Sequence, residues 1–273
     1  MTEVDPPAGG GPDAASPRQR IGLRLAYDGA AYSGWQAQPQ RRTVQGMLAE
    51  AIAVLDPTAD SLRGSSRTDA GVHALDQVAA FTCSRCLAPE VWLRAINANL
   101  PRDIVVLKAW LAPLDFDPVG AAVRKRYRYR LHDDPVRPLF GRAFAWRQPA
   151  RLDVEAMREA AGALVGEHDF TSFETASSQR RTKVRTIYDL TVARGDAVER
   201  PAAEVHVEVE GNGFLYNMVR IIVGSLAMVG VGRRPPSWLA EARDARHRPA
   251  AGPTAPAHGL TLVSIHLDAS AAD

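Results

Sequence analysis

The chain has 273 residues, of which 46% are hydrophobic and 23% are charged, a composition typical of a soluble globular protein with one large domain or two modest ones. Lys and Arg together number 33 and Asp and Glu 31, so the net charge of +2 by itself indicates neither a nucleic acid nor a membrane as partner. The only cysteines, Cys83 and Cys86, argue against a disulfide-stapled secreted fold, and no second Cys or His pair follows at the spacing of a zinc site.

The two ends of the chain differ from its body. Residues 1–18 are rich in Pro and Gly and have almost no large apolar side chains, so we expect a disordered tail there, and we expect residues 269–273 to fray. No apolar run reaches the roughly 18 residues that span a bilayer, and the start of the chain has no apolar signal-peptide core. We therefore predict a cytoplasmic protein.

The first half of the ordered chain alternates between strand and helix patterns. Apolar residues at every second position predict a strand over 21–27, and a second strand is expected over 77–82. Thr43 is a suitable N-cap for a helix whose apolar residues recur at helical spacing, and Pro89 can open another helix. The apolar run 104–107 predicts a short buried strand.

The second half, which we begin at residue 117, repeats this mixture. Its predicted strands are 124–131, 186–192, 205–209 and 260–267, and its predicted helices are 153–165 and 216–229. The segment 233–258, rich in Pro, Ala and Arg, is a long connection with no clear pattern. We predict an α+β fold of two similar halves, 19–116 and 117–268, each a largely antiparallel sheet backed by helices.

The first candidate site is a single carboxylate, Asp69, within the run of small residues Gly64–Ala74. Such a loop lets a ligand approach closely, and Arg67 would hold Asp69 ionised, as a nucleophile or base requires. An ordinary turn in which Asp69 caps a backbone amide fits the same residues. A metal site made of Asp69, His73 and Asp76 matches no known ligand spacing.

The second candidate is the strand over 124–130, which interleaves cations and aromatics. Because side chains alternate on a strand, Lys125, Tyr127 and Tyr129 share one face. The opposite face has four arginines: Arg124, Arg126, Arg128 and Arg130. Charge for phosphates beside rings for bases favours a nucleic acid, while the alternative is an edge strand that uses charge to resist aggregation.

Three further segments belong to the pattern. Arg220 lies in an apolar predicted helix, where an unpaired guanidinium is costly, so it should meet a carboxylate or a phosphate unless its long stem reaches solvent. The run 179–185 is a second basic segment, and charge runs alone are weak indicators. Residues 27–38 gather aromatic, Gly and Gln residues that suit either a substrate loop or a packed turn.

These five segments, in this order, resemble the TruA family of tRNA pseudouridine synthases, and the resemblance runs from about Leu23 to Leu267. Its most specific pieces are Arg67–Ala74, Tyr27–Gly29 with Gly34–Gln36, and Asn217–Arg220 with Val223–Gly224; Ala257–Leu260 also fits.

The resemblance implies an isomerase that converts uridine to pseudouridine at positions 38, 39 and 40, in the anticodon arm of tRNA. It implies that no cofactor and no metal take part. It also implies a homodimer in which tRNA lies across both subunits, with the active-site cleft between the two halves of the chain.

Site residues follow from the same resemblance. Asp69 matches the family's essential aspartate, and Arg67 matches a residue that contacts RNA and helps to displace the target base. Tyr127 matches the tyrosine that packs on the target uracil, and Arg220 matches the arginine that pairs with the catalytic carboxylate. A tRNA-contacting loop is matched by Gln179, Arg180, Arg181 and Thr182.

The chain departs from the family pattern at two places. Ser66 stands where glycine is common. The stretch Asp117–Gly120 lacks the basic residue that some relatives place in a tRNA-contacting segment, which puts that RNA contact in doubt and leaves the chemistry intact.

The implied reaction suits a lone carboxylate. An N-glycosidic bond breaks, the uracil rotates and a carbon–carbon bond forms, so substrate and product are isomers and no redox partner is needed. Asp69 would either attack the ribose or remove a proton from it. Two other classes compete: an RNA-binding module or chaperone, which gives Asp69 no task, and a glycosidase-type hydrolase, which needs a second acid for which Asp76 is a weak candidate.

Overall fold

The computed structural model describes residues 18–175, 182–198 and 200–268. The predicted tails 1–18 and 269–273 therefore lie outside the described residues, apart from Arg18. The guanidinium of Arg18, a residue that we expected in the tail, forms an ion pair with Asp60 at 2.6 Å.

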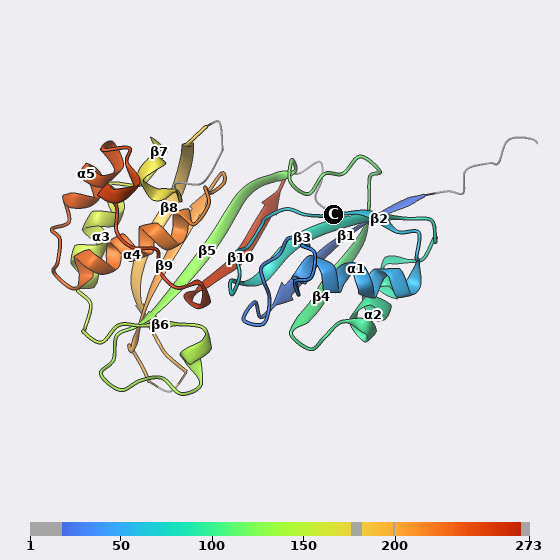
Figure 1. Cartoon of the computed structure of the whole chain (residues 1–273), viewed down its shortest axis with the longest axis horizontal. Coiled ribbons are helices and arrows are strands. Elements are labelled where there is room, and N and C mark those ends of the chain that lie inside the picture. Colours follow the sequence, from blue (N-terminus) through green and yellow to red (C-terminus); the bar gives the residue numbers. More distant parts are fainter. Residues whose placement is uncertain (1–17, 176–181, 199, 269–273) are drawn as a thin grey trace, which may run out of the picture.

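A single ten-stranded sheet runs through the whole molecule, as Figure 1 shows. Its strand order is β4-β1-β3-β10-β5-β9-β8-β7, with β2 paired to β3 and β6 paired to β5. The N-terminal strands are β1 (Gln19–Tyr27), β2 (Asp60–Gly64), β3 (His73–Cys83) and β4 (Ile104–Ala112). The C-terminal strands are β5 (Ala122–His132), β6 (Trp146–Arg147), β7 (Gly166–Asp169), β8 (Val184–Gly195), β9 (Glu204–Gly211) and β10 (Leu260–Leu267).

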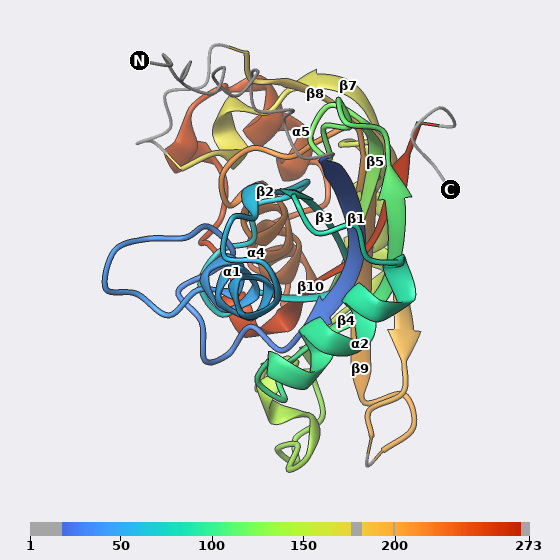
Figure 2. The same cartoon turned by 90° about the vertical axis from the view of Figure 1, so that its right-hand side faces the viewer.

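Helices from both halves lie over the same face of this sheet, as α1 and α4 do in Figure 2. The N-terminal helices are α1 (Val44–Leu55) and α2 (Pro89–Asn99), and the C-terminal helices are α3 (Val154–Gly162), α4 (Met218–Gly230) and α5 (Trp238–Asp244). Thr43 caps α1 as predicted, because its hydroxyl accepts a hydrogen bond from the backbone N–H of Gly46. The predicted α+β class is confirmed.

The last strand joins the two halves. β10 pairs in parallel with β3 through Thr261 and Leu262, and it pairs antiparallel with β5 along most of its length. The predicted half-sheets are therefore parts of one continuous sheet. Because β3 follows the Asp69 loop and β5 contains Tyr127, the insertion of β10 fixes the spacing of the two candidate segments.

The sequence misjudged two stretches. The run 104–107 lies in a strand, as predicted, but it is only half-buried, since Val105 is 42% and Leu107 53% exposed. β4 is an edge strand on which α2 packs, so alternate side chains face solvent. The connection 233–258 contains α5, whose 7 residues are too few to show a helical period and which buries Leu239.

Candidate active site

Asp69 lies in the loop between β2 and β3, and a residue from the other half of the chain meets it there. Nη1 of Arg220, in α4, is 3.1 Å from Oδ2 of Asp69. The side chain of Asp69 is 24% exposed and that of Arg220 17%. Asp69 is thus the anion that the apolar surroundings of Arg220 require, and the pair spans the junction between the halves.

Burial and Arg220 act on Asp69 in opposite directions. Burial raises the pKa of Asp69 above its usual range, while the charge of Arg220 and its hydrogen bond lower it, and the net shift is upward. Arg67 is exposed and makes no ion pair with Asp69 within the described residues. The expectation that Arg67 holds the carboxylate ionised is therefore wrong, because the cation beside it comes from α4.

Two further oxygen atoms hold the guanidinium of Arg220, one from residue 255 and one from the N-cap of α4 itself. Its Nε donates to the carbonyl of Ala255 at 2.8 Å, and its Nη1 donates to Oδ1 of Asn217 at 2.7 Å. Asn217, the N-cap of α4, has a left-handed backbone with φ of 62°, a conformation that Asn tolerates better than most residues. Its Nδ2 donates to the hydroxyl of Thr175 at 2.8 Å, which ties α4 to the chain that precedes β8.

A segment that we call the 252–259 strap crosses the helix and the sheet at this point. It lies so close to α4 that a Cβ at Gly224 would be 1.8 Å from the carbonyl oxygen of Pro253, so only glycine fits. The strap accepts a hydrogen bond from the hydroxyl of Tyr129, at 2.7 Å, and contacts Nε2 of His73. The strap therefore connects α4, β5 and the first residue of β3, which directly follows the Asp69 loop. The sequence pattern of residues 252–259 did not predict these contacts.

Tyr127 projects from β5 toward the same place. Its hydroxyl is 2.9 Å from Oγ of Ser66, and its ring packs edge-on against Phe214 with centroids 5.2 Å apart. Burial raises the pKa of Tyr127 to about 12, the Ser66 hydrogen bond lowers it, and the charge of Asp69 raises it. The phenol is thus protonated at neutral pH and close enough to Asp69 to sense its charge.

The segment 27–38 is a packed turn that supports the Asp69 loop. Trp35 is buried, and its backbone N–H donates to the carbonyl of Thr68 at 3.0 Å. Gly34 has a φ of 90° and approaches the same carbonyl so closely that a Cβ would be 2.7 Å from it. The hydroxyls of Tyr27 and Thr68 are 2.8 Å apart, which anchors the residue directly before Asp69.

The buried side-chain amide of Gln77 also supports the Asp69 loop, although no local pattern predicted this role. Gln77 of β3 accepts a hydrogen bond from the N–H of Ser66 at 3.1 Å and donates to its carbonyl at 2.6 Å. The side chain of Gln77 is 0% exposed. One glutamine on a strand has no local signal in the sequence, since its partners lie eleven residues away.

The other acidic and imidazole groups of this region have their own partners. Asp76 forms an ion pair with Arg24 at 2.5 Å, and Nδ1 of His73 is 3.0 Å from Asp28. Among the described residues no group of three His, Cys, Asp or Glu side chains could hold a metal ion. Asp76 is therefore not positioned as a second acid for Asp69.

The arginine face of β5 has a different character from the one expected. β5 is a central strand between β10 and β9, so it is not a solvated edge. Each of its arginines forms an ion pair with a glutamate of β9: Arg124 with Glu210, Arg126 with Glu208 and Glu210, Arg128 with Glu208, and Arg130 with Glu204. Arg126 also pairs with Asp189 of β8 at 3.5 Å. Because these cations have carboxylate partners within the protein, their number alone does not indicate a nucleic acid.

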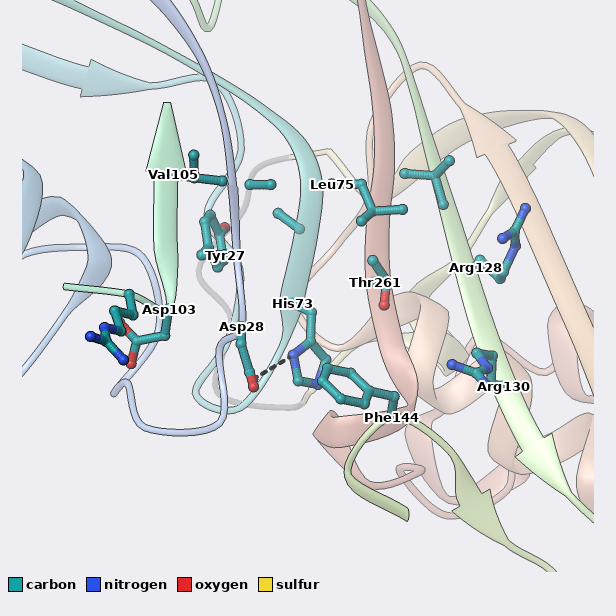
Figure 3. Close-up of a pocket in the computed structure, with 14 residues that line it drawn as sticks. Tyr27, Asp28, His73, Leu75, Asp103, Val105, Arg128, Arg130, Phe144 and Thr261 are labelled. Atoms are coloured by element: carbon teal, nitrogen blue, oxygen red, sulfur yellow. Dashed lines mark ion pairs between the residues drawn. The ribbon is translucent and has the colours of Figure 1, made fainter. Parts of the chain in front are cut away.

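A pocket of about 340 Å³ opens on this arginine side (Figure 3). Its wall includes Arg128 and Arg130 at one end, and His73, Asp28 and Phe144 near the middle. Neither the Asp69–Arg220 pair nor Tyr127 lines it. This pocket and the candidate site are thus separate places.

The basic loop is only partly within the described chain. Gln179, Arg180 and Arg181 lie outside the described residues. Thr182 is exposed, and its hydroxyl accepts a hydrogen bond from the N–H of Val184 at 3.3 Å.

Comparisons with known proteins match most of this chain to one family. A family model described as tRNA pseudouridine synthase matches residues 25–119 and 160–268, which include Asp69 and Arg220, while Tyr127 falls between the two matched ranges. The chain is 43% identical over 251 residues to tRNA pseudouridine synthase A of Bacillus subtilis (strain 168), which covers 91% of this chain and 99% of that protein. It is 45% identical over 244 residues to tRNA pseudouridine synthase A of Halalkalibacterium halodurans, covering 89% and 90% of the two chains.

Solved structures give a more distant match. The crystal structure of the archaeal box H/ACA sRNP Nop10-Cbf5 complex aligns with 12% identity and a TM-score of 0.34, covering 85% of this chain and 60% of that one.

Proposed function

The chain belongs to the tRNA pseudouridine synthase family, and from this premise we propose that it isomerises uridine to pseudouridine in tRNA with Asp69 as its single catalytic carboxylate. The observation that carries the assignment of Asp69 is its ion pair with Arg220, formed between a loop of one half and a helix of the other. We further propose positions 38, 39 and 40 of the anticodon arm as the targets, from the resemblance to the TruA family.

The reaction needs no atoms beyond those of the substrate. The bond between C1′ of the ribose and N1 of uracil breaks, the base rotates, and C1′ bonds to C5. The proton on C5 leaves and N1 gains one, so the atoms balance and neither oxidant nor reductant is consumed. We propose that no cofactor and no metal take part.

Asp69 is suited to this task by the opposed effects on its pKa. The raised pKa makes the carboxylate a stronger base and nucleophile than an ordinary aspartate, while Arg220 favours the ionised form at neutral pH. Attack on the ribose and removal of a ribose proton both start from this anion. Either route therefore requires Asp69 ionised and Arg220 in place.

The target uridine must leave the base stack to reach Asp69, at a cost of a few kcal/mol. We propose that Tyr127 packs on the extruded uracil and that Arg67, exposed two residues before Asp69, occupies the vacated space. The resemblance adds Gln179, Arg180, Arg181 and Thr182 as a loop that contacts tRNA.

Three broader proposals rest on the same resemblance. We infer a homodimer with tRNA lying across both subunits, with 19–116 and 117–268 as the two halves of each active site. We also infer that the enzyme works in the cytoplasm. In the described part of the chain no helix has both the length and the apolar character needed to cross a membrane.

Mapping pseudouridine in unmodified tRNA transcripts incubated with the purified protein tests the proposal. Carbodiimide adducts that stop primer extension should appear after incubation at positions 38 to 40 and nowhere else. An Asp69→Asn protein, mixed with the same transcripts, is the control. If the unaltered protein binds tRNA and leaves every uridine unchanged, the alternative of an RNA-binding module replaces this proposal.

A further inference from the structure

Two hydroxyls meet beneath the Asp69 loop. Oγ of Ser66 and the phenol oxygen of Tyr127 are 2.9 Å apart, and the two residues are only 7% and 6% exposed. They come from strands of different halves, since Ser66 follows β2 and Tyr127 belongs to β5. This hydrogen bond therefore crosses the same junction as the Asp69–Arg220 ion pair.

Ser66 is itself rigidly held. Gln77 hydrogen-bonds both its N–H and its carbonyl, at 3.1 and 2.6 Å. The carbonyl of the preceding residue, Ser65, accepts a hydrogen bond from Nζ of Lys125 at 2.7 Å. Because Lys125 and Tyr127 share a face of β5, this strand hydrogen-bonds two successive residues of the loop, Ser65 and Ser66. The hydroxyl of Ser66 is thus a fixed reference point for the ring of Tyr127.

The ring of Tyr127 is otherwise held by apolar contact. Phe214 packs edge-on against it with an interplanar angle of 87°. A buried phenol normally needs a hydrogen-bond partner, and Ser66 is the partner that lies within reach. A glycine at position 66, the residue common in the TruA family, has no hydroxyl to offer.

We propose that Ser66 is a positioning residue, whose hydroxyl fixes the ring of Tyr127 in the place where it receives the target uracil. Ser66 acts through Tyr127 and does not touch the reacting atoms. The inference rests on the proposed function, because it assigns Ser66 a role in holding the base-stacking tyrosine. In this chain the serine adds a hydroxyl-mediated link between the halves that glycine cannot make.

A spectroscopic test addresses the link without using activity. The chain has six tyrosines, so protein labelled with 3-fluorotyrosine gives a fluorine spectrum simple enough to assign. The signal lost in Tyr127→Phe identifies Tyr127. In Ser66→Ala we expect that one signal to shift or broaden while the other five stay in place. An unchanged Tyr127 signal in Ser66→Ala overturns the inference.

A kinetic test addresses the positioning role. Loss of one hydrogen bond should lower the single-turnover rate of Ser66→Ala by about threefold to tenfold, with tRNA affinity unchanged. In a Tyr127→Phe background the same substitution should have almost no further effect, because the phenol is already gone. An equal loss in both backgrounds, or no loss in the first, contradicts the inference.

Controls separate this inference from the proposed function. Ser172→Ala removes another buried serine hydroxyl, which accepts from the N–H of His247 at 2.8 Å, and it should leave the rate unchanged. An active enzyme with additive Ser66 and Tyr127 effects refutes the inference alone. An unaltered protein that forms no pseudouridine refutes the proposed function and the positioning role of Ser66 with it.

Discussion

The two sides of β5 have opposite characters although they alternate residue by residue. One side presents Tyr127 and Tyr129, which are buried and lie near the Asp69–Arg220 pair. The other side presents arginines, each matched by a glutamate on β9. The side with the formal charge is thus neutralised within the protein, and the nearly uncharged side faces the proposed chemistry.

The difference comes from strand register. Arg126 is paired directly with Glu210, and Arg128 with Glu208, so these two cations have a carboxylate as cross-strand neighbour. Arg124 and Arg130 reach Glu210 and Glu204 as ion pairs without lying directly opposite them. A run of basic residues in a sequence therefore measures how much charge is present and not how much is available to a ligand. Five substitutions test this contrast between the two sides, beginning with the largest expected effect.

Asp69→Asn, a change on the tyrosine side of the sheet, should abolish turnover. We expect the rate to fall by at least about a thousandfold, because the amide can serve neither as nucleophile nor as base. Binding of tRNA should persist. Release of tritium from 5-labelled uracil in tRNA measures the loss, and substantial residual release by the variant would remove Asp69 from its catalytic role.

Arg220→Gln should lower the rate by about a hundredfold, as expected when a charged group beside a reacting carboxylate is lost. It should also move the acidic limb of the pH profile. Arg220 lowers the pKa of Asp69 against the effect of burial, so its loss raises that pKa further. Since only the anion reacts, activity should then disappear at a higher pH as the solution is acidified. A pH–rate profile of single turnovers measures this, and an unmoved limb would contradict the pairing.

Arg67→Ala should reduce the rate by about tenfold through weaker capture of the flipped state, because extrusion of the base costs a few kcal/mol. Arg67 is exposed and has no carboxylate partner within the described residues, in contrast to the arginines of β5. A fluorescent base analogue at the target position would report extrusion. If extrusion is undiminished in the variant, Arg67 does not contribute to it.

Asn217→Ala should lower the rate about fivefold by loosening Arg220, because one hydrogen bond to its charged guanidinium is lost while the bond to the carbonyl of Ala255 remains. Asn217→Gly is the matched variant, since glycine keeps the left-handed φ without strain and removes only the amide. Equal rates with a lower melting temperature for the alanine protein would assign its extra cost to the backbone. Full activity in the glycine variant would show that Asn217 does not position Arg220.

Arg128→Gln, on the arginine side, should have the smallest effect. Exposed ion pairs contribute about 0–1 kcal/mol, and Glu208 keeps Arg126 as a partner after the change. Affinity for tRNA and its dependence on salt should match those of the unaltered protein within error. A reduced salt dependence of tRNA binding would mean that Arg128 contacts phosphate after all, and the contrast between the two sides would fall.

Patterns among neighbouring residues were sufficient to predict much of the fold. The alternation in β1, the Thr43 cap of α1 and the apolar period of α4 are properties of neighbouring residues, and the structure confirms each of these elements. Arg220 could be expected to find an anion because a charge in an apolar helix needs one. Such features depend on short-range chemistry, which a single sequence contains.

What the sequence could not supply were contacts between distant segments. The neutralisation of the β5 arginines depends on register with β9, about 80 residues later, as for Arg128 and Glu208. Gln77 matters only because its amide faces Ser66, and the 252–259 strap matters only because it crosses α4. From sequence proximity alone, Arg67 was the cation expected beside Asp69, whereas the structure places Arg220 of α4 there, as the family resemblance implied.

The place of β10 has a consequence for how the enzyme is made. The ribosome completes β1 to β9 before it makes the strand that lies between β3 and β5, so until then the parts of those strands that pair with β10 are unpaired. Each half can begin to fold as it emerges, but the halves cannot share a sheet until the tenth strand arrives. The Asp69 loop and Tyr127 are spaced by that strand, so a partly synthesised chain has the residues for catalysis without their arrangement. Assembly of the active site is thereby linked to completion of the fold.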